Sequence, residues 1–449
     1  MSRQAIVVGL GETGMSCVPY LRGAGYEVLV CDSRSTPPLM ASLQERYPGV
    51  PLLTGPFRED VFVGVDLLVV SPGVSAKEPA IRAAARNGVA IVGDVELFAR
   101  VCDAPVIAIT GSNGKSTVTT LVGDMLTRSG LRVAVAGNIG LPVLTLLGHA
   151  APDVYVLELS SFQLETTVSL NAQAATVLNV SPDHMDRYDD LAEYAHAKAG
   201  IFAGFGRMVV NRDDPCVATM AHADREVMSF GLDRPTGHDY GLLTYESEVW
   251  LAQGKQRLMP ASAIPVPGRH NVANVLAAFA LAEVMSRDTL AMIEAVREFR
   301  GLAHRTQVVG HLDGVSWIDD SKGTNVGATA AALTGLNGPV VLIAGGDGKG
   351  ADFSVLAPIV REKARAVVLI GRDAPQIKEA LAGCCPLHSA RDMDEAVLAA
   401  YQYARSGDQV LLSPACASFD MFRNYAHRGD VFTAAVQRLI LSKVGGAHD

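Results

Sequence analysis

Short apolar runs recur along the whole chain, and each ends in a polar or glycine-containing turn. Runs this short, bounded by turn residues, are typical of buried strands. The predicted strands are residues 5–8, 27–31, 65–70, 106–109, 132–136, 154–159, 176–180, 315–319, 340–344, 367–370 and 409–412. Helical segments lie between them, for example 191–202 and 268–285. Strands that alternate with helices predict an α/β protein with parallel sheets and right-handed crossovers.

The stretch Val106–Thr120 carries the strongest functional pattern. A predicted strand ends at Ile109, a glycine-rich turn follows, and the next helix begins with Lys115 and Ser116. Backbone N–H groups of such a turn converge on one point, Lys115 can reach the terminal phosphates of a nucleotide, and the Ser116 hydroxyl can ligate Mg²⁺. Ile109 stands where the standard P-loop has its first glycine, and Gly111 comes two residues later. The strand–turn–helix context still predicts that the chain binds ATP or GTP.

The first strand leads into a second phosphate-binding pattern. Residues Gly9–Gly14 complete G-x-G-x-x-G before a predicted helix, and the second strand ends at Asp32. This is the dinucleotide fingerprint with its acidic residue at about the expected distance. Ser33 and Arg34 add a hydroxyl and a forked donor that suit a ribose, a uracil or a phosphate. NAD and another nucleotide diphosphate both stay possible, and the second is favoured because the P-loop already accounts for one nucleotide.

Two residues at strand ends of the middle segment are candidates for the chemistry. Glu158 ends a predicted strand, where a carboxylate facing a P-loop is the usual second anchor for Mg²⁺. The alternative is a buried glutamate paired with an arginine. His184 follows the strand 176–180 at the same sheet edge and is either a loop residue with its hydrogen bonds satisfied or a site residue.

Three further polar residues of this segment lie on predicted helices. Lys198, on the helix 191–202, by itself reads as a solvated helix lysine. Asn271 and Asn274 open the alanine-rich helix 268–285, where their amides either face an adenine or cap the helix.

Polar turns follow three strands of the last third of the chain, at Asp320–Asn325, Gly345–Lys349 and Ser413–Asp420. Because the carboxyl ends of parallel strands meet at one sheet edge, these turns are expected to converge. Cys416 in the third turn invites interpretation as a nucleophile, but no histidine stands at a recognisable spacing, and a small buried thiol is favoured.

Three α/β units in series describe the chain of 449 residues. We predict a Rossmann-like N-terminal domain at 1–93, a central P-loop ATPase domain at 94–301 and a Rossmann-like C-terminal domain at 302–449. No apolar stretch approaches the ~18 residues of a membrane span, and the first residues lack the features of a signal peptide. With seven scattered cysteines, this predicts a cytoplasmic protein with reduced thiols. A net charge of −9 without a basic run argues against nucleic-acid binding.

The motifs together resemble the Mur ligase family, in all three predicted domains and in order. They are T-G-S-N-G-K-S-T at 110–117, E-L-S-S-F-Q-L-E at 158–165, S-P-D-H-M-D-R-Y at 181–188, G-R-H-N-V-A-N at 268–274, H-R at 304–305, D-D-S-K-G-T-N at 319–325 and G-G-D-G-K at 345–349. The stretch 413–425 with Arg428-Gly429 is most similar to the members that use D-glutamate. Glu12 and Tyr425 stand where leucine and phenylalanine are often found.

The resemblance implies an ATP-dependent amide ligase of peptidoglycan precursor synthesis. It would add D-glutamate to UDP-N-acetylmuramoyl-L-alanine through an acyl phosphate and a tetrahedral intermediate. ATP would be the co-substrate and Mg²⁺, as two ions, the cofactor. The expected protein is a monomer whose partners are these two substrates.

The resemblance also implies roles for single residues. Catalysis would depend on Lys115, His184 and a carbamylated Lys198. The metal ligands would be Ser116, Glu158, His184 and Lys198. ATP would contact Gly111, Ser112, Asn113, Gly114, Lys115, Ser116, Thr117, Asn271, Asn274, His304, Arg305 and Asp320. The UDP-sugar would contact Thr13, Asp32, Ser33, Arg34, Gly73, Asn138 and His184. D-glutamate would contact Lys322, Thr324, Lys349, Ser418, Phe419 and Tyr425.

Other functions stay possible from the sequence. An NAD-dependent dehydrogenase would use Gly9–Gly14 but leaves Lys115 and Lys322 unexplained. A non-catalytic nucleotide-binding regulator would keep the P-loop without an acceptor site. A folate-polyglutamate ligase shares the chemistry, but the N-terminal nucleotide unit counts against it.

Overall fold

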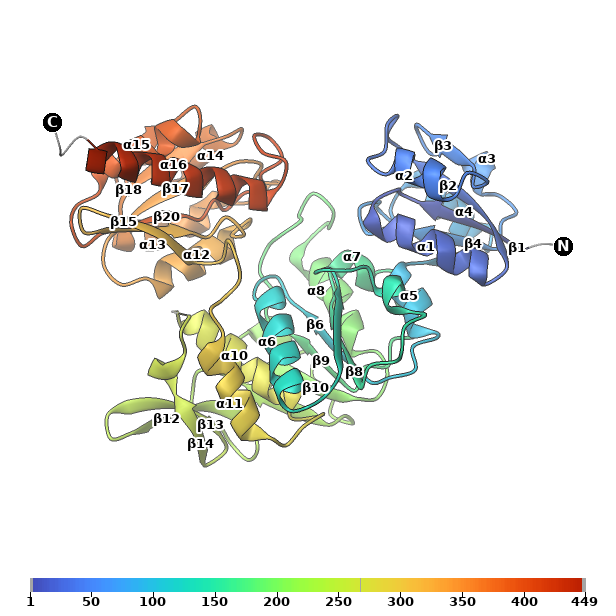
Figure 1. The fold of residues 1–449 in the computed structure, drawn as a ribbon, viewed down its shortest axis with the longest axis horizontal. Coiled ribbons are helices and arrows are strands. Elements are labelled where there is room, and N and C mark those ends of the chain that lie inside the picture. Colours follow the sequence, from blue (N-terminus) through green and yellow to red (C-terminus); the bar gives the residue numbers. More distant parts are fainter. Residues whose placement is uncertain (1–2, 267, 446–449) are drawn as a thin grey trace. The chain divides into compact units, whose positions relative to one another are not determined.

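The computed structural model describes residues 3–266 and 268–445. These residues form two compact units. The first unit holds the described residues up to Val180, together with Ala192–Pro260 and Asn274–Val296. The second holds Ser181–Leu191, the described part of Ala261–Ala273 and the described residues from Arg297 onward. Figure 1 labels many of the helices and strands of both units.

The N-terminal sheet has five parallel strands in the order β3-β2-β1-β4-β5. Its strands are β1 (Arg3–Val8), β2 (Tyr26–Asp32), β3 (Leu52–Thr54), β4 (Leu67–Val70) and β5 (Ala90–Val92). The helices around it are α1 (Glu12–Gly23), α2 (Met40–Arg46), α3 (Glu59–Phe62), α4 (Pro79–Arg86) and α5 (Asp94–Ala99). Apolar residues of α1 and α5 join one buried cluster, and those of α3 and α4 join another, so helices cover both faces of the sheet.

The central sheet has nine strands in the order β14-β13-β12-β11-β10-β9-β6-β8-β7. Its strands are β6 (Val106–Thr110), β7 (Val133–Gly137), β8 (Val154–Glu158), β9 (Ala174–Val177), β10 (Arg207–Asn211), β11 (Val227–Phe230), β12 (Tyr240–Tyr245), β13 (Glu248–Gln253) and β14 (Gln256–Pro260). Its helices are α6 (Lys115–Arg128), η1 (Val143–Leu146), α7 (Ser161–Leu164), α8 (Leu191–Ala199), η2 (Gly200–Phe202), α9 (Pro215–Ala218), η3 (Ala261–Ala263), α10 (Arg269–Ala282) and α11 (Thr289–Glu298).

The C-terminal sheet has six strands in the order β15-β16-β20-β17-β18-β19. Its strands are β15 (Gln307–Leu312), β16 (Val315–Asp319), β17 (Val340–Gly345), β18 (Ala364–Ile370), β19 (Leu387–Ser389) and β20 (Gln409–Leu412). The helices are α12 (Val326–Gly335), η4 (Phe353–Leu356), α13 (Ala357–Lys363), α14 (Ala374–Ala380), α15 (Met393–Tyr403) and α16 (Tyr425–Gly445). All neighbouring strands are parallel except β15 and β16.

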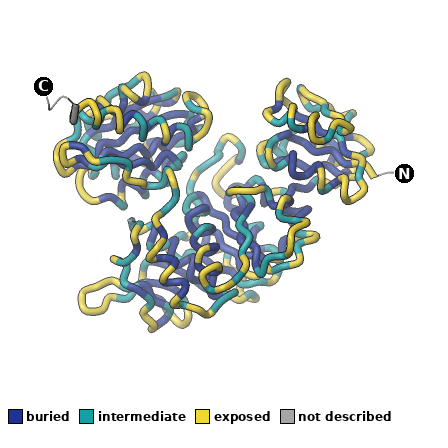
Figure 2. The backbone as a smooth tube through the Cα atoms, in the orientation of Figure 1, coloured by how far each residue is buried: buried dark blue, intermediate teal, exposed yellow. Residues whose placement is uncertain are grey.

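The C-terminal core follows from the two-residue period of its strands. Val341 and Ile343 of β17 pack with α15 and α16 on one face, whereas Leu342 and Ala344 pack with α12, η4 and α14 on the other. A strand buried on both faces must be apolar at every position, which explains why it appears in the sequence as a continuous apolar run. Figure 2 shows the strands in the buried colour and the outer sides of the helices exposed.

The structure confirms the predicted α/β class, and each predicted strand is present with its ends shifted by a few residues at most. Each sheet lies inside one predicted domain, while the exact boundaries at 93 and 301 stay a prediction. The predicted helix 191–202 is wrong in its last turn, which is the 3₁₀ helix η2. Among the described residues, no helix is both long and apolar enough to cross a membrane.

The antiparallel part of the central sheet was not predicted from the sequence. Strands β12, β13 and β14 form a meander with antiparallel pairing. The β12–β13 turn is made by Glu246 and Ser247, whose φ angles are 50° and 66°. This turn conformation usually calls for asparagine or glycine, so the hairpin signal is weak in the sequence.

Candidate active site

The P-loop lies at the end of β6 and the start of α6. Gly114 has φ of +84°, a left-handed conformation, and a Cβ atom there would meet Asn274 Oδ1 at 2.5 Å. Asn179 fixes the loop from outside: its side-chain Oδ1 accepts from Asn113 N at 2.8 Å, and its backbone oxygen accepts from Ser112 N at 2.9 Å. The role of Asn179 was not predicted, because the residue lay inside the predicted strand 176–180, whereas β9 ends at Val177.

Two lysines converge on one carbonyl of this loop. Lys115 Nζ donates to Gly111 O at 2.7 Å and to Ser112 O at 2.9 Å. Lys198 Nζ donates to the same Gly111 O at 2.9 Å and lies 4.4 Å from the centre of the Tyr194 ring. The interpretation of Lys198 as a solvated lysine is wrong, because the residue is only 1% exposed. The Lys115 cation beside a cradle of N–H groups suits a polyphosphate anion.

Glu158 ends β8 beside β6, opposite Ile109. Its Oε1 accepts from Asn138 Nδ2 at 2.6 Å, whereas its Oε2 is buried and has no hydrogen-bond partner in the described part of the chain. No arginine pairs with it among the described residues, so the structure does not support the buried-pair alternative. Burying a carboxylate oxygen without a donor is costly, and a cation there would offset that cost.

The residues of the first unit therefore fit a Mg²⁺ ion. Glu158 offers an oxygen, and the buried Ser116 hydroxyl stands at the N-terminus of α6. Both are the hard oxygen ligands that Mg²⁺ prefers. Within the described residues, no group of three or more His, Cys, Asp and Glu side chains could hold a metal ion by itself. The predicted ligands Lys198 and His184 belong to the first and the second unit respectively.

Asp32 organises the nucleotide loop of the N-terminal sheet. Its carboxylate accepts from Leu10 N at 2.7 Å and from Arg34 Nε and Nη2 at 2.8 and 2.6 Å. Burial alone would raise the pKa of Asp32, but the hydrogen bonds from Arg34 and Leu10 lower it to about 2. The carboxylate therefore stays charged, and Arg34, about half exposed, is held at the carboxyl edge of the sheet. Thr13, Ser33 and Gly73 lie in segments beside this edge.

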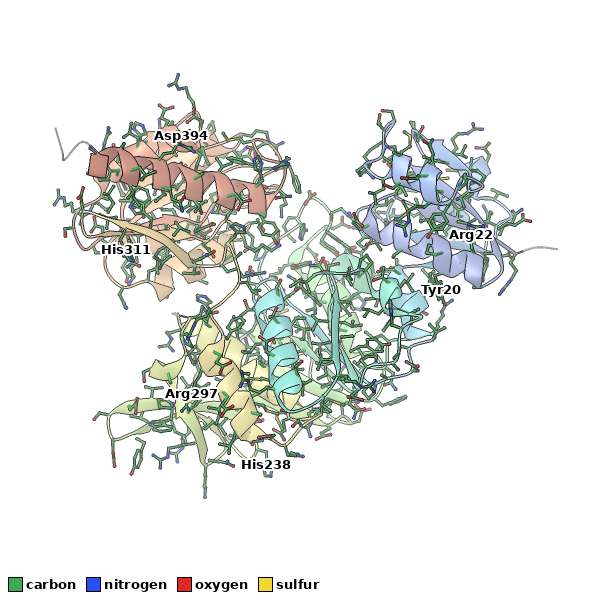
Figure 3. The ribbon with its side chains drawn as sticks, in the orientation of Figure 1. Tyr20, Arg22, His238, Arg297, His311 and Asp394 are labelled. Atoms are coloured by element: carbon green, nitrogen blue, oxygen red, sulfur yellow. The ribbon has the colours of Figure 1, made fainter. Side chains whose placement is uncertain are left out.

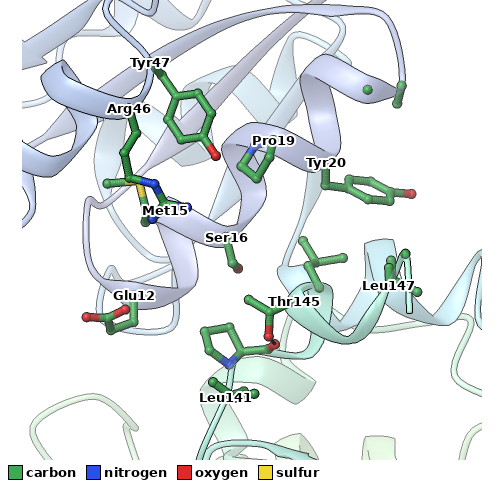
Figure 4. Close-up of a pocket in the computed structure, with 15 residues that line it drawn as sticks. Glu12, Met15, Ser16, Pro19, Tyr20, Arg46, Tyr47, Leu141, Thr145 and Leu147 are labelled. Carbon is green, nitrogen blue, oxygen red and sulfur yellow. Dashed lines mark hydrogen bonds between the residues drawn. The ribbon is translucent and has the colours of Figure 1, made fainter. Parts of the chain in front are cut away.

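A cavity of about 650 Å³ lies along one side of α1. Figure 4 shows Glu12, Ser16 and Tyr20 of α1 on one side and Leu141 and Thr145 of the loop before and within η1 on the other. Tyr20, labelled in Figure 3 as well, donates from its hydroxyl to Leu97 O at 3.4 Å. Glu12 precedes the predicted UDP-sugar contact Thr13 directly, so one end of the cavity adjoins the predicted nucleotide loop.

In the second unit, the three polar turns meet as predicted. They follow β16, β20 and β17, which are neighbours in the sheet. Backbone hydrogen bonds join them: Ala415 N donates to Gly323 O at 2.9 Å, and Asp347 N donates to Ala417 O at 2.9 Å. The turns that carry Lys322, Lys349 and Ser418 are therefore one connected surface.

Arg428 on α16 holds two of these turns together and is 1% exposed. Its Nε and Nη2 donate to Ser321 Oγ and O at 3.0 and 2.8 Å, and its Nη1 donates to Cys416 O at 3.0 Å and Ala417 O at 3.3 Å. Burial lowers the pKa of the Arg428 guanidinium to about 10, which leaves it charged at neutral pH. Cys416 is a buried thiol whose pKa burial raises to about 12, as expected of a structural cysteine.

The cationic residues of this surface have aromatic and acidic neighbours. Lys322 Nζ lies 3.9 Å from the centre of the Tyr425 ring. Lys349 Nζ lies 2.9 Å from Asp183 Oδ1. Ser418 is buried, whereas Phe419 is 74% exposed. The predicted D-glutamate residues thus share one edge, with Phe419 at its periphery.

His304 and Asp320 form the other part of this edge. His304 Nδ1 lies 2.7 Å from Asp319 Oδ2. Asp320 accepts from Ser413 Oγ at 2.7 Å and from Thr306 N at 3.1 Å, and burial raises its pKa to about 6 in spite of these donors. His304 and Thr306 have φ of 61° and 48°, conformations that cost energy and cluster at functional sites.

Comparison with known proteins identifies the family. The family model of the Mur ligase middle domain matches residues 109–282, that of the MurD-like N-terminal domain matches 3–93, and that of the Mur ligase glutamate ligase domain matches 304–416. The chain belongs to the Mur ligase family. The resemblance predicted from the motifs is thereby confirmed.

Relatives of this Mur ligase extend over nearly its whole length. It is 54% identical over 441 residues to UDP-N-acetylmuramoylalanine--D-glutamate ligase of Methylobacillus flagellatus, with 97% of each chain covered. It is 52% identical to the protein of the same name from Methylococcus capsulatus, over 97% of this chain and 95% of the other. Its fold matches a pseudomurein peptide ligase type C from Methanothermus fervidus with a TM-score of 0.60 at 17% identity, over 97% of this chain and 100% of the other.

The units of this Mur ligase each bring part of the predicted site together. In the first unit, Lys115 and Lys198 both donate to the Gly111 carbonyl of the P-loop, and Asn138 donates to Glu158. The second joins Lys349 to the segment that holds His184, and it joins the turns of Asp320 and Ser418. The bracing residues Asn179 and Arg428 had no assigned role in the sequence analysis.

Proposed function

We propose that this Mur ligase joins D-glutamate to UDP-N-acetylmuramoyl-L-alanine in peptidoglycan precursor synthesis, with ATP converted to ADP and phosphate. The observation that carries this assignment is the identity of about half of all residues, over 97% of the chain, with proteins named for that activity. The match of residues 3–93 to a MurD-like N-terminal domain favours this activity over the folate-polyglutamate ligase alternative. Membership of a ligase family also argues against the dehydrogenase and the non-catalytic regulator.

In the proposed reaction a carboxylate oxygen of the alanyl residue attacks the γ-phosphorus of ATP, and ADP leaves. The amine nitrogen of D-glutamate then attacks the carbonyl carbon of the acyl phosphate and loses a proton. The tetrahedral intermediate expels phosphate and leaves the amide. Phosphoryl transfer of this kind depends mainly on positioning and on neutralising charge.

The first unit supplies the phosphate-binding groups in this proposal. The P-loop N–H groups hold the ATP phosphates, and Lys115 neutralises charge on the transferred phosphoryl group. Ser116 and Glu158 would hold Mg²⁺, with His184 and a carbamylated Lys198 as the further predicted ligands. Mg²⁺ supplies charge neutralisation at the phosphates when it is bound. Asn271, Asn274, His304, Arg305 and Asp320 are proposed for the rest of ATP.

The remaining contacts are also proposals. The N-terminal edge around Asp32 and Arg34 suits the uridine diphosphate. Asn138 donates to Glu158, and the carboxylate of the UDP-sugar is proposed to bind beside this pair. Lys349, with Thr324 and Ser418, is proposed for the side-chain carboxylate of D-glutamate. The monomeric state and the cytoplasmic location stay predictions.

A substrate screen tests the proposal. Phosphate release from ATP is measured with UDP-N-acetylmuramoyl peptides of different length against D- and L-amino acids. We expect turnover with UDP-N-acetylmuramoyl-L-alanine and D-glutamate and little with L-glutamate. Lys349→Ala should raise the KM for D-glutamate far more than that for ATP, whereas Lys378→Ala, an exposed lysine on α14, should change neither. Equal changes in both KM values, or efficient use of L-glutamate, would contradict the assignment.

A further inference from the structure

Lys349 already holds a carboxylate that belongs to the chain itself. Its Nζ lies 2.9 Å from Asp183 Oδ1, and the two side chains are only 17% and 10% exposed. Asn325 Nδ2 donates to the other oxygen, Asp183 Oδ2, at 3.0 Å. The backbone N–H of His184 donates to Oδ1 at 2.9 Å. Lysine, amide and N–H donors thus surround both oxygens of one carboxylate, as they would surround a bound anion.

The two side-chain donors come from two of the three turns that converge at the sheet edge. Asn325 ends the turn after β16, and Lys349 lies in the turn after β17. Both elements, and the segment of Asp183, belong to the second unit. The side-chain carboxylate of D-glutamate is chemically the same group as the side-chain carboxylate of Asp183. Two carboxylates cannot both be the close partner of one lysine without mutual repulsion.

Hydrogen bonds hold the backbone of the Lys349 turn in place, so a change of partner falls to its side chain. Lys349 has φ of 52°, and its N–H donates to Asp347 Oδ1 at 3.1 Å. The preceding Gly348 N–H donates to Asp373 Oδ2 at 2.6 Å. On the other side of the ion pair, His184 has φ of 59°. A left-handed conformation at a non-glycine residue persists only where its surroundings enforce it.

We propose that Asp183 is an internal carboxylate that occupies the lysine of the amino-acid site until D-glutamate displaces it. This inference rests on the proposed function, because it needs Lys349 to receive a carboxylate of the incoming amino acid. Asp183 then raises the KM for D-glutamate, since the substrate must break an existing, largely buried ion pair. Asp183 also excludes ligands that bind weakly through a single carboxyl group. Such a ligand gains at Lys349 only an interaction equal to the one that it displaces from Asp183. Asp183 is in this view a specificity-determining residue.

The test compares Asp183→Asn with Asp186→Asn in the full-length chain. Asp186 is exposed and lies in the same segment, so this control makes the same change of charge without touching Lys349. A charge-assisted hydrogen bond contributes enough to predict that Asp183→Asn lowers the KM for D-glutamate about tenfold. The KM for ATP should stay within about twofold. The inhibition constant of glutarate, a dicarboxylate without the amine, should fall in parallel.

A second variant, Asp183→Ser, guards against misfolding or a new contact of the asparagine amide. A lower KM in either folded variant supports the proposal. An unchanged or higher KM in both overturns it and assigns the pair to anchoring the segment 181–188. Lys349→Ala separates this failure from a failure of the proposed function. If the function is wrong, D-glutamate gives no turnover or Lys349→Ala has no selective effect on its KM, whatever Asp183 does.

Discussion

Replacing Arg428 by methionine should destabilise the second unit by about 2–4 kcal/mol. Methionine has no donors and a shorter side chain, so the substitution removes the hydrogen bonds to Ser321, Cys416 and Ala417 and leaves part of the guanidinium's buried space empty. The carbonyl of Ala417 keeps a partner, because Asp347 N also donates to it. Ser321 O and Cys416 O lose the donor that Arg428 gave them. An unsatisfied buried carbonyl costs about 1–3 kcal/mol, and relief from burying a charged guanidinium offsets part of the sum.

Besides the loss of stability, the substitution should have a functional effect that is selective for D-glutamate. Arg428 joins the turn of Lys322 to the turn of Ser418, and both belong to the proposed D-glutamate surface. We therefore expect Arg428→Met to raise the KM for D-glutamate at least tenfold at a temperature where the variant is folded, with the KM for ATP changed less. Arg428→Lys keeps the charge, but a single nitrogen cannot reach both turns, so it should restore stability only in part.

Thermal and denaturant unfolding measure the loss of stability, and steady-state kinetics measure the KM for D-glutamate and for ATP. Arg438→Met is the matched control, because Arg438 lies on the same helix and pairs with the exposed Asp394. An exposed ion pair contributes about 1 kcal/mol at most, so the control should unfold almost like the native chain. The reasoning fails if Arg428→Met is as stable as the control and binds D-glutamate normally.

Three further predictions address the first unit. Lys115→Ala should lower kcat by about 100-fold or more in steady-state assays of phosphate release, because a positioned cation supplies several kcal/mol to phosphoryl transfer; near-normal turnover would end the P-loop assignment. Lys198→Ala should be almost inactive and partly rescued by short-chain carboxylates in the same assay, since an ammonium cannot coordinate Mg²⁺ and a carbamate can. Burial raises the pKa of Asp94 to about 6, so its stabilising contribution is complete below the unfolded value near 3.8 and is lost as pH rises through 6. Asp94→Asn should therefore gain about 2.4 kcal/mol relative to the native chain between pH 4 and pH 8 in denaturant unfolding, and an equal difference at both pH values would refute this.

The sequence predicted those parts of the site whose position depends on sheet topology alone and not on side-chain packing. The turns after β16, β17 and β20 could be assigned to one edge because parallel strands carry all their carboxyl ends to the same side. The same rule located the P-loop and Glu158 beside each other, since β6 and β8 are neighbours in the central sheet. Each of these residues lies within a few positions of a strand end that the apolar pattern had already located.

The residues that the local sequence pattern could not assign act across long separations, although the family resemblance did give Lys198 a role. Arg428 reaches Ser321 over 107 positions, and Lys198 reaches Gly111 over 87. Neither stands out on its own helix: Lys198 lies among alanines, as a solvated lysine would. Whether a lysine is buried depends on the residues that pack around it, and one sequence without homologues does not reveal those residues. The ion pair of Asp183 with Lys349, over 166 positions, is of the same kind. The local pattern therefore located the donors of the proposed amino-acid site. Only the fold shows that a carboxylate of the chain itself, that of Asp183, lies beside them.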